Sequence, residues 1–302
     1  MTGTTKAVGK QESLDRSALI ALLDRYAKAL VAHDAKSLPL APNVRFTENG
    51  QAIALTEGLW CTASGMHTPR YAEFADPKNG AAGFFGVAEE TGVQVLLGAR
   101  LKTEGGLISE IETLVIRPHG LLFNPAAMLK PAHVYKKIAP SARASREALV
   151  AAANAYFNGI ERSNGRMIPV LPDCLRIENG TQTVLAVGAD FVPHREGFSV
   201  FPLGVADQID SGFFAYIARI RDRRFPVIDE EQSLVLVIGF FDHPGNVKTV
   251  EVKGVGTVDL PPFTQSPFSL MFMEAFQVEN GKIRGISAVM ESCPYGYRTG
   301  WE

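Results

Sequence analysis

Apolar residues recur at helical spacing in two stretches of this chain. In the first stretch, one face of a helix would carry Leu19, Leu22, Leu23, Tyr26 and Leu30. The second stretch has the same spacing, and its shared face would carry Leu149, Ala152, Ala153, Tyr156 and Ile160. Ser13 and Ser145 stand where helix N-caps are expected. The pattern therefore predicts an amphipathic helix at the start of each half of the chain.

Segments rich in β-branched and aromatic residues follow each predicted helix. In the first half they cover residues 44–48, 93–104 and 108–117, with a Gly-Gly turn between the last two. In the second half, residues 213–245 have the pattern of a long hairpin, and Asn280-Gly281 marks the turn of a final hairpin. Helices followed by antiparallel strands are typical of an α+β architecture.

The two halves also share a motif at a fixed distance from the helix tyrosine. The first copy reads RFTENGQ and the second reads RIENGTQ. Glu48 follows Tyr26 by 22 residues, and Glu178 follows Tyr156 by the same 22. A repeat of this length indicates domain duplication rather than a solenoid.

Composition and charge narrow the class of protein. The chain has 302 residues, a hydrophobic fraction of 46%, a charged fraction of 21% and a formal net charge of −2, which is typical of a soluble globular protein. The balanced charge argues against a nucleic-acid partner. No apolar run reaches about 18 residues, so we expect no membrane span. A polar N-terminus and three widely spaced cysteines predict a cytoplasmic location.

Motifs that bind cofactors are absent from the sequence. It has no GxGxxG, GxxxxGK[ST] or GxSxG motif, and no CxxC or HExxH spacing. We therefore expect no nucleotide, flavin or metal cofactor.

The run RYAKALVAHDAKSLPLAPNVRFTENG, which begins at Arg25, resembles the opening of the nuclear transport factor 2-like superfamily. That superfamily includes the SnoaL-like cyclases and ketosteroid isomerase. The resemblance implies two cone-shaped α+β barrels, each a curved antiparallel sheet wrapped around N-terminal helices. Residues 10–139 and 140–302 would form the two domains and pack sheet to sheet as an intramolecular pseudo-dimer. Homodimerisation of the whole chain stays open.

The same resemblance assigns catalytic roles. The catalytic base of ketosteroid isomerase lies near the end of the first strand, which places it at Glu48. The tyrosine of the oxyanion hole lies on the first helix, which places it at Tyr26 and, in the second half, at Tyr156. The second aspartate of that family has no match, because Met273 takes its place in the second half, with Glu274 one residue away.

Strand alternation distinguishes the two repeated glutamates. Glu48 shares a face with Val44 and Phe46, so we expect a partly desolvated carboxylate with a raised pKa beside a phenylalanine pocket wall. The alternative is a glutamate that only orders the turn after it. Glu178 shares its face with Arg176, which predicts an ion pair. We therefore expect the working base in the first half and a degenerate or different substrate site, with Glu178 and Tyr156, in the second.

Four further side chains are candidates for the pocket. His243 lies in the turn-like sequence FFDHPGN and is either a catalytic acid or base, or a turn residue. His67 and His194 lie in loops that would border the mouth of the pocket. Trp60 would be a pocket wall or a core residue.

These residues suggest a cofactor-independent lyase or isomerase. Glu48 would remove a proton from a small apolar, cyclic or aromatic carbonyl compound, and Tyr26 or a histidine would stabilise the oxyanion or return the proton. A non-catalytic binding or scaffold protein and an epoxide-type hydrolase stay open, because one fold supports many activities. An unpaired Glu48 facing a cavity would favour the enzyme, and a Glu48 bonded only to backbone amides would favour the binding protein.

Overall fold

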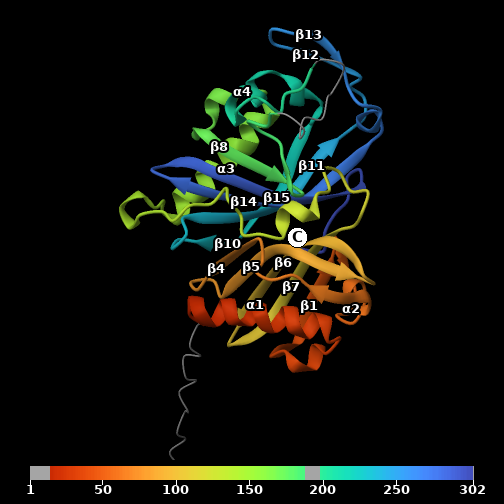
Figure 1. The fold of residues 1–302 in the computed structure, drawn as a ribbon, viewed down its shortest axis with the longest axis vertical. Coiled ribbons are helices and arrows are strands. Elements are labelled where there is room, and N and C mark those ends of the chain that lie inside the picture. The colour runs from red at the N-terminus through yellow and green to blue at the C-terminus, as the bar shows by residue number, and fades with distance from the viewer. Residues whose placement is uncertain (1–13, 188–197, 302) are drawn as a thin grey trace, which may run out of the picture.

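A computed structural model describes residues 14–187 and 198–301 of the chain (Figure 1). The fold has a mixed α+β content, with two large sheets and few helices. The elements of the first half are α1 (Arg16–Val31), η1 (Ala35–Ser37), β1 (Leu40–Glu48), β2 (Gln51–Ala52), α2 (Leu59–Thr62), β3 (Ala63–Met66), β4 (Ala72–Asp76), β5 (Ala81–Glu90), β6 (Val93–Glu104) and β7 (Leu107–Ile116).

A connecting segment and the second half follow. The connection contains η2 (Pro125–Met128) and η3 (Pro140–Ala142). The elements of the second half are α3 (Arg146–Glu161), η4 (Gly165–Met167), β8 (Val170–Glu178), β9 (Thr181–Gln182), α4 (Val205–Asp210), η6 (Phe213–Tyr216), β10 (Arg219–Asp229), β11 (Leu234–His243), β12 (Thr249–Val252), β13 (Gly256–Asp259), η7 (Pro262–Gln265), β14 (Phe268–Glu279) and β15 (Lys282–Pro294).

The two long helices form where the apolar spacing predicts them. The Ser145 hydroxyl caps α3 by accepting a hydrogen bond from the Ala148 amide at 3.3 Å, as expected. The N-cap of α1 is Asp15, whose carboxylate accepts from the Ala18 amide at 2.8 Å. The expected cap Ser13 lies outside the described residues.

Each large sheet contains one parallel pair of strands, so the expectation of purely antiparallel sheets is wrong. The strand order is β2-β1-β7-β6-β5-β3 in the first sheet, with β4 also paired to β5, and β10-β11-β14-β15-β8-β9 in the second. β1 runs parallel to β7, and β8 runs parallel to β15. The chain that separates the two strands of each parallel pair is long enough to make the crossover that parallel pairing requires.

Corresponding elements of the two halves begin at a constant distance. α1 and α3 each have 16 residues and start at Arg16 and Arg146. Likewise, β1 and β8 each have nine residues and start at Leu40 and Val170, so both pairs are 130 apart. The Asn-Gly pair after each of these strands has positive φ angles, 49° and 78° in the first half and 47° and 85° in the second. Asparagine and glycine tolerate this conformation, which accounts for the repeated Glu-Asn-Gly motif.

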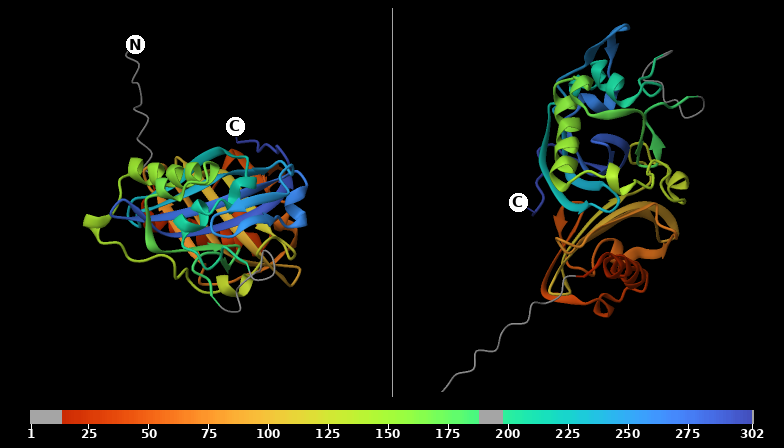
Figure 2. Two further views of the ribbon diagram at one scale, coloured as in Figure 1. Left: turned by 90° about the horizontal axis from the view of Figure 1, so that it is seen from above. Right: turned by 90° about the vertical axis from the view of Figure 1, so that its left-hand side faces the viewer.

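The core has three main layers. One cluster packs α1 against the first sheet, and another packs α3 against the second sheet. A third cluster lies between the two sheets and contains residues of both, including Phe85 and Leu96 from the first and Leu236, Met273 and Val289 from the second. α1 and α3 therefore lie on the outer sides of two sheets that face each other (Figure 2).

Two buried ion pairs link the halves at equivalent positions. Arg16, the first residue of α1, contacts Asp229 of the second half at 2.7 Å. Arg146, the first residue of α3, contacts Asp76 of the first half at 2.7 Å. Both aspartate side chains are almost fully buried, so these pairs fix how each helix sits against the opposite sheet.

Two further observations concern the chain as a whole. In the described part of the chain, no helix has the length and apolar character needed to cross a membrane. Cys61, Cys174 and Cys293 are free thiols.

Candidate functional site

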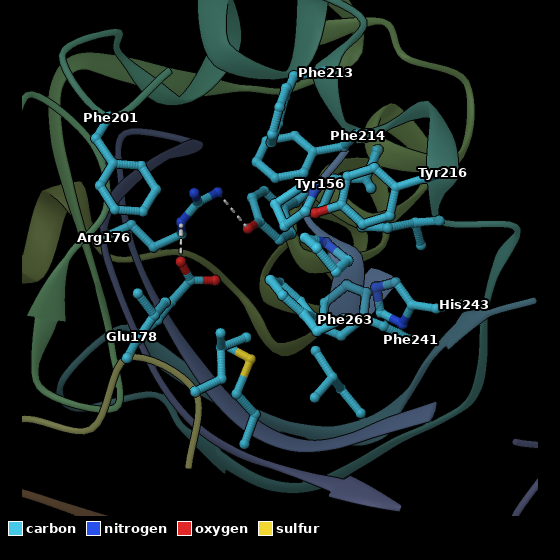
Figure 3. A pocket seen from close by; sticks show the side chains of 18 residues that line it. Tyr156, Arg176, Glu178, Phe201, Phe213, Phe214, Tyr216, Phe241, His243 and Phe263 are labelled. Atoms are coloured by element: carbon cyan, nitrogen blue, oxygen red, sulfur yellow. Dashed lines mark hydrogen bonds and ion pairs between the residues drawn. The ribbon is translucent and has the colours of Figure 1, made fainter. Parts of the chain in front are cut away.

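A cavity of about 380 Å³ opens inside the second half. It lies between α3, the second sheet and the segments around η6 and η7, and Figure 3 shows the side chains that line it. Most of the lining is apolar and aromatic, including Phe201, Phe213, Phe214, Phe241 and Phe263. This size and this lining are typical of small-molecule sites.

Arg176 forms the centre of the polar wall of this cavity. It lies on β8, and its side chain is only 3% exposed. Its Nε donates to Thr183 Oγ1 at 2.9 Å, its Nη1 donates to the Tyr156 hydroxyl at 3.1 Å, and its Nη2 donates to Gln208 Oε1. Because every guanidinium nitrogen has a partner, the buried charge is held in one orientation.

Glu178 lies beside Arg176 at the end of the same strand. Its Oε2 is 3.2 Å from Arg176 Nε, so the ion pair expected from the shared strand face is present. The two charges cancel within the polar wall. Figure 3 shows both side chains on one side of the cavity.

Tyr156 and Glu274 belong to the same polar cluster as Arg176, and of these two Tyr156 lines the cavity. Tyr156 comes from α3, is fully buried and lines the cavity. Glu274 on β14 is also buried, its Oε2 has no hydrogen-bond partner among the described residues, and it interacts with the Tyr156 hydroxyl. Burial, reinforced by the nearby Glu178 charge, raises the pKa of Glu274 well above its usual value, while Arg176 opposes the shift. Burial therefore favours the neutral, protonated form of Glu274.

The position of Glu274 corrects the conclusion that the second half lacks an inward-facing acid. Met273 packs between the two sheets. Strand alternation therefore turns Glu274 to the opposite face, toward Tyr156. The resemblance places the acid at Met273, one residue away from the side chain that faces the interior.

His243 lies on the opposite side of the cavity from Arg176 and Glu178 (Figure 3). It ends β11, and its ring stacks on Phe268 with centroids 4.2 Å apart. Its Nδ1 is buried and has no hydrogen-bond partner in the described part of the chain. Burial lowers the pKa of His243 to about 4, against the smaller opposing effects of the Phe241 backbone and Asp242. The imidazole is therefore neutral at neutral pH, with one ring nitrogen free to accept a proton.

In the first half a loop packs against the glutamate at the corresponding position. Glu48 Oε2 accepts from the Leu59 amide at 2.7 Å, and its Oε1 lies 3.2 Å from Arg117 Nη2. A side chain on Gly58, which has φ of 64°, would collide with the same carboxylate. Glu48 is therefore paired with a backbone amide and with an arginine, so the unpaired carboxylate that would favour an enzyme in the first half is not what the structure has, and the loop that carries Gly58 and Leu59 closes over it.

The other expected residues of the first-half site are core residues. Tyr26, Phe46 and Trp60 are buried in the cluster beneath α1, and the rings of Tyr26 and Trp60 meet edge to face with centroids 5.6 Å apart. None of these three residues lines the cavity of the second half. Burial, followed by the Glu48 charge, raises the pKa of Tyr26, so its hydroxyl stays protonated.

A protein-family model described as "Domain of unknown function (DUF8021)" matches residues 12–115 and 142–290. The chain belongs to this family. The matched residues of this DUF8021 protein include both long helices, Arg176, Glu178, His243 and Glu274. No curated protein matches the sequence.

Three solved structures resemble part of this DUF8021 chain. The alignment with a crystal structure of a de novo designed protein with a curved β-sheet covers 35% of this chain and 89% of the designed chain, with 14% identity and a TM-score of 0.28. A "putative ketosteroid isomerase" from Kribbella flavida DSM 17836 covers 35% and 82%, with 15% identity and a TM-score of 0.29. A "putative polyketide cyclase" from Silicibacter sp. tm1040 covers 34% and 91%, with 17% identity and a TM-score of 0.27.

Of the other two histidines expected at the pocket of this DUF8021 protein, one lies away from the cavity and the other lies outside the described residues. His67 follows β3 at the edge of the first sheet, with its Nε2 3.3 Å from Glu89 Oε1, and does not line the cavity. His194 lies outside the described residues. Among the described residues, no group of three or more His, Cys, Asp or Glu side chains is placed to hold a metal ion.

We expect the buried acid of this DUF8021 protein to make folding stability depend on pH. Above about pH 4.5 the unfolded chain ionises Glu274, whereas the raised pKa keeps it protonated to a higher pH in the folded chain, so the free energy of unfolding falls as pH rises through this interval. Glu274→Gln keeps the shape and cannot ionise. Its stability relative to the unaltered protein should therefore rise with pH, by at most about 1.4 kcal/mol per unit. Denaturant unfolding at mildly acidic and mildly alkaline pH measures this difference.

The exposed Glu57 provides the control for this prediction. Glu57→Gln should show no such dependence. An equal pH dependence of both variants would contradict a neutral Glu274.

Proposed function

We propose that this protein is a cofactor-independent lyase or isomerase that acts by proton transfer on a small, mainly apolar carbonyl compound held in the cavity of the second half. One observation carries the proposal: an aromatic cavity has Arg176 and Tyr156 on one side and an unprotonated His243 on the other. A bound molecule would lie between a hydrogen-bonding wall and a base.

The chemistry follows from that separation. His243 takes a proton from the carbon next to the carbonyl, and the electrons of the broken C–H bond form an enolate. Tyr156 donates a hydrogen bond to the enolate oxygen, while its own oxygen accepts from Arg176 Nη1 and its hydroxyl lies beside Glu274. Return of the proton to another carbon gives isomerisation, and departure of a neighbouring group gives elimination.

The first half has a structural role in this proposal. The chain would be a tandem of two homologous domains, residues 10–139 and 140–302, that pack as a pseudo-dimer. The constant spacing of corresponding elements and the equivalent Arg16–Asp229 and Arg146–Asp76 pairs support this view. The first domain keeps the motif but has exchanged its pocket for core, and so acts as a platform for the second.

A matched pair of tyrosine variants tests the reaction. Tyr156→Phe removes the oxyanion donor and should lower the rate of deuterium exchange into cyclic ketones by about 10²-fold or more, followed by NMR. Tyr26→Phe removes the equivalent hydroxyl of the first half, outside the cavity, and should leave the rate unchanged. Equal losses from both variants, or no catalysed exchange with any ketone that binds, would refute the proposal.

A second candidate is ligand binding without turnover. The Arg176–Glu178 pair favours it, because the glutamate at the position of the ketosteroid isomerase base is ion-paired with its neighbour. In that case ketones would bind and no exchange would follow.

A further inference from the structure

The polar wall of the cavity consists mainly of Arg176 and Glu178, and we ask which of the two a ligand can hydrogen-bond. Arg176 is the cation of this wall, and each of its nitrogens already donates to a protein oxygen, on Thr183, Tyr156 or Gln208. The adjacent Glu178 carboxylate cancels its charge. An incoming anion would therefore meet an arginine whose charge is already balanced, together with the negative charge of Glu178 beside it.

One carboxylate oxygen remains open to the cavity. Glu178 Oε2 is paired with Arg176, whereas Oε1 has no hydrogen-bond partner among the described residues. The Glu178 side chain is 17% exposed and lines the cavity, and Figure 3 shows it pointing inward. An ionised carboxylate accepts hydrogen bonds and donates none. The complementary group on a ligand is therefore a hydrogen-bond donor, and a hydroxyl is the donor that an otherwise apolar, neutral ring molecule can carry.

The remaining walls favour a flat ring system. Phe213 meets Phe214 and Tyr216 edge to face, with centroids 5.5 and 5.9 Å apart. These rings, together with Phe241 and Phe263, surround the space that faces Glu178. Aromatic rings pack best against other rings in offset or edge-to-face arrangements, and a planar molecule supplies both a face and an edge.

We propose that the cavity selects a neutral, flat ring molecule whose hydroxyl group donates a hydrogen bond to Glu178 Oε1, and that it rejects the corresponding carboxylate. This inference names the substrate class of the proposed function and rests on it. The natural substrate would carry this hydroxyl in addition to the carbonyl oxygen that faces Tyr156.

Three probes with the same ring system separate the contribution of the donated hydrogen bond from that of the probe's charge. At neutral pH, 2-naphthol is a neutral donor, 2-methoxynaphthalene lacks the donor, and 2-naphthoate is an anion. Isothermal titration calorimetry of the full chain should give a Kd for 2-naphthol at least about ten-fold lower than for 2-methoxynaphthalene, because a hydrogen bond to a charged acceptor contributes about 1.5–3 kcal/mol. 2-Naphthoate should bind no more tightly than 2-methoxynaphthalene.

A charge variant should invert this preference. Glu178→Gln leaves Arg176 without its counter-ion, so 2-naphthoate should gain affinity by about ten-fold or more while the advantage of 2-naphthol shrinks. Glu48→Gln is the matched control in the first half. It should leave the ranking of the three probes unchanged, with circular dichroism confirming that both variants fold.

The outcomes separate this inference from the proposed function. Tight binding of 2-naphthoate to the unaltered protein, equal binding of the hydroxyl and methoxy probes, or an unchanged ranking in Glu178→Gln would overturn the inference. Failure of deuterium exchange while the predicted ranking holds would overturn the proposed reaction and leave the ligand class standing.

Discussion

Replacing His243 with phenylalanine should lower proton-exchange activity by about 10²-fold to 10⁴-fold, the range that loss of a general base produces. Phenylalanine keeps a ring of similar size over Phe268 and removes both nitrogens. The fold should therefore persist while the base is lost. Deuterium exchange into a bound cyclic ketone, with circular dichroism as the check on folding, measures the effect.

The pH dependence of the unaltered protein gives an independent test of the same group. Because the pKa of His243 is lowered from 6.5 to about 4, activity should persist down to about pH 5 and fall as pH drops through about 4. Folding stability should fall as pH drops from 6.5 to about 4, because the unfolded histidine binds a proton first, and the loss should reach about 3 kcal/mol. His243→Phe should remove this part of the pH dependence.

His67→Phe is the control for the His243 variant, because His67 lies outside the cavity. It should keep full activity. Comparable losses from both histidine variants, or an acid limb near pH 6.5, would contradict the assignment of His243 as the base.

The local structure was largely predictable from the sequence. The helical spacing of Leu19 to Leu30 and its repeat located α1 and α3, and strand alternation placed Arg176 beside Glu178. These features depend on the nearest residues in the chain. The mixed strand pairing was missed, because the parallel contacts of β1 with β7 and of β8 with β15 join residues far apart in sequence.

The cavity of the second half could not be located from the sequence, for a physical reason. Whether a repeated glutamate faces a cavity depends on what fills the space in front of it. In the first half the loop with Gly58 packs directly against Glu48, and Trp60 of the same loop is a core residue. In the second half Glu178 lines a cavity whose walls include aromatic residues such as Phe213. One signal was visible in the sequence: Glu274 interrupts the apolar run SLMFMEAF, and a lone acid in such a strand marks a buried polar site.

Replacing Arg176 with phenylalanine should destabilise the fold by about 3 kcal/mol or more, because it leaves the Glu178 carboxylate beside an apolar cavity without its counter-ion. Phenylalanine is the residue that the first half has at the equivalent position, Phe46, where it packs in the core. Denaturant unfolding without ligand measures the loss of stability. The double variant Arg176→Phe, Glu178→Gln should recover a substantial part of it, since no charge is then left unpaired.

The ion pair at the corresponding glutamate of the first half sets the scale for this result. Arg117, which pairs with both Glu48 and Glu90, has a side chain that is 42% exposed, whereas that of Arg176 is 3% exposed. Solvent screens the exposed pair, so Arg117→Phe should cost at most about 1 kcal/mol. If Arg176→Phe cost no more than Arg117→Phe, or if the double variant recovered nothing, the buried ion pair would not be what holds the polar wall together. If the losses differ as expected, the same repeated glutamate has a solvent-screened arginine partner in one half and depends on a buried arginine at the cavity of the other.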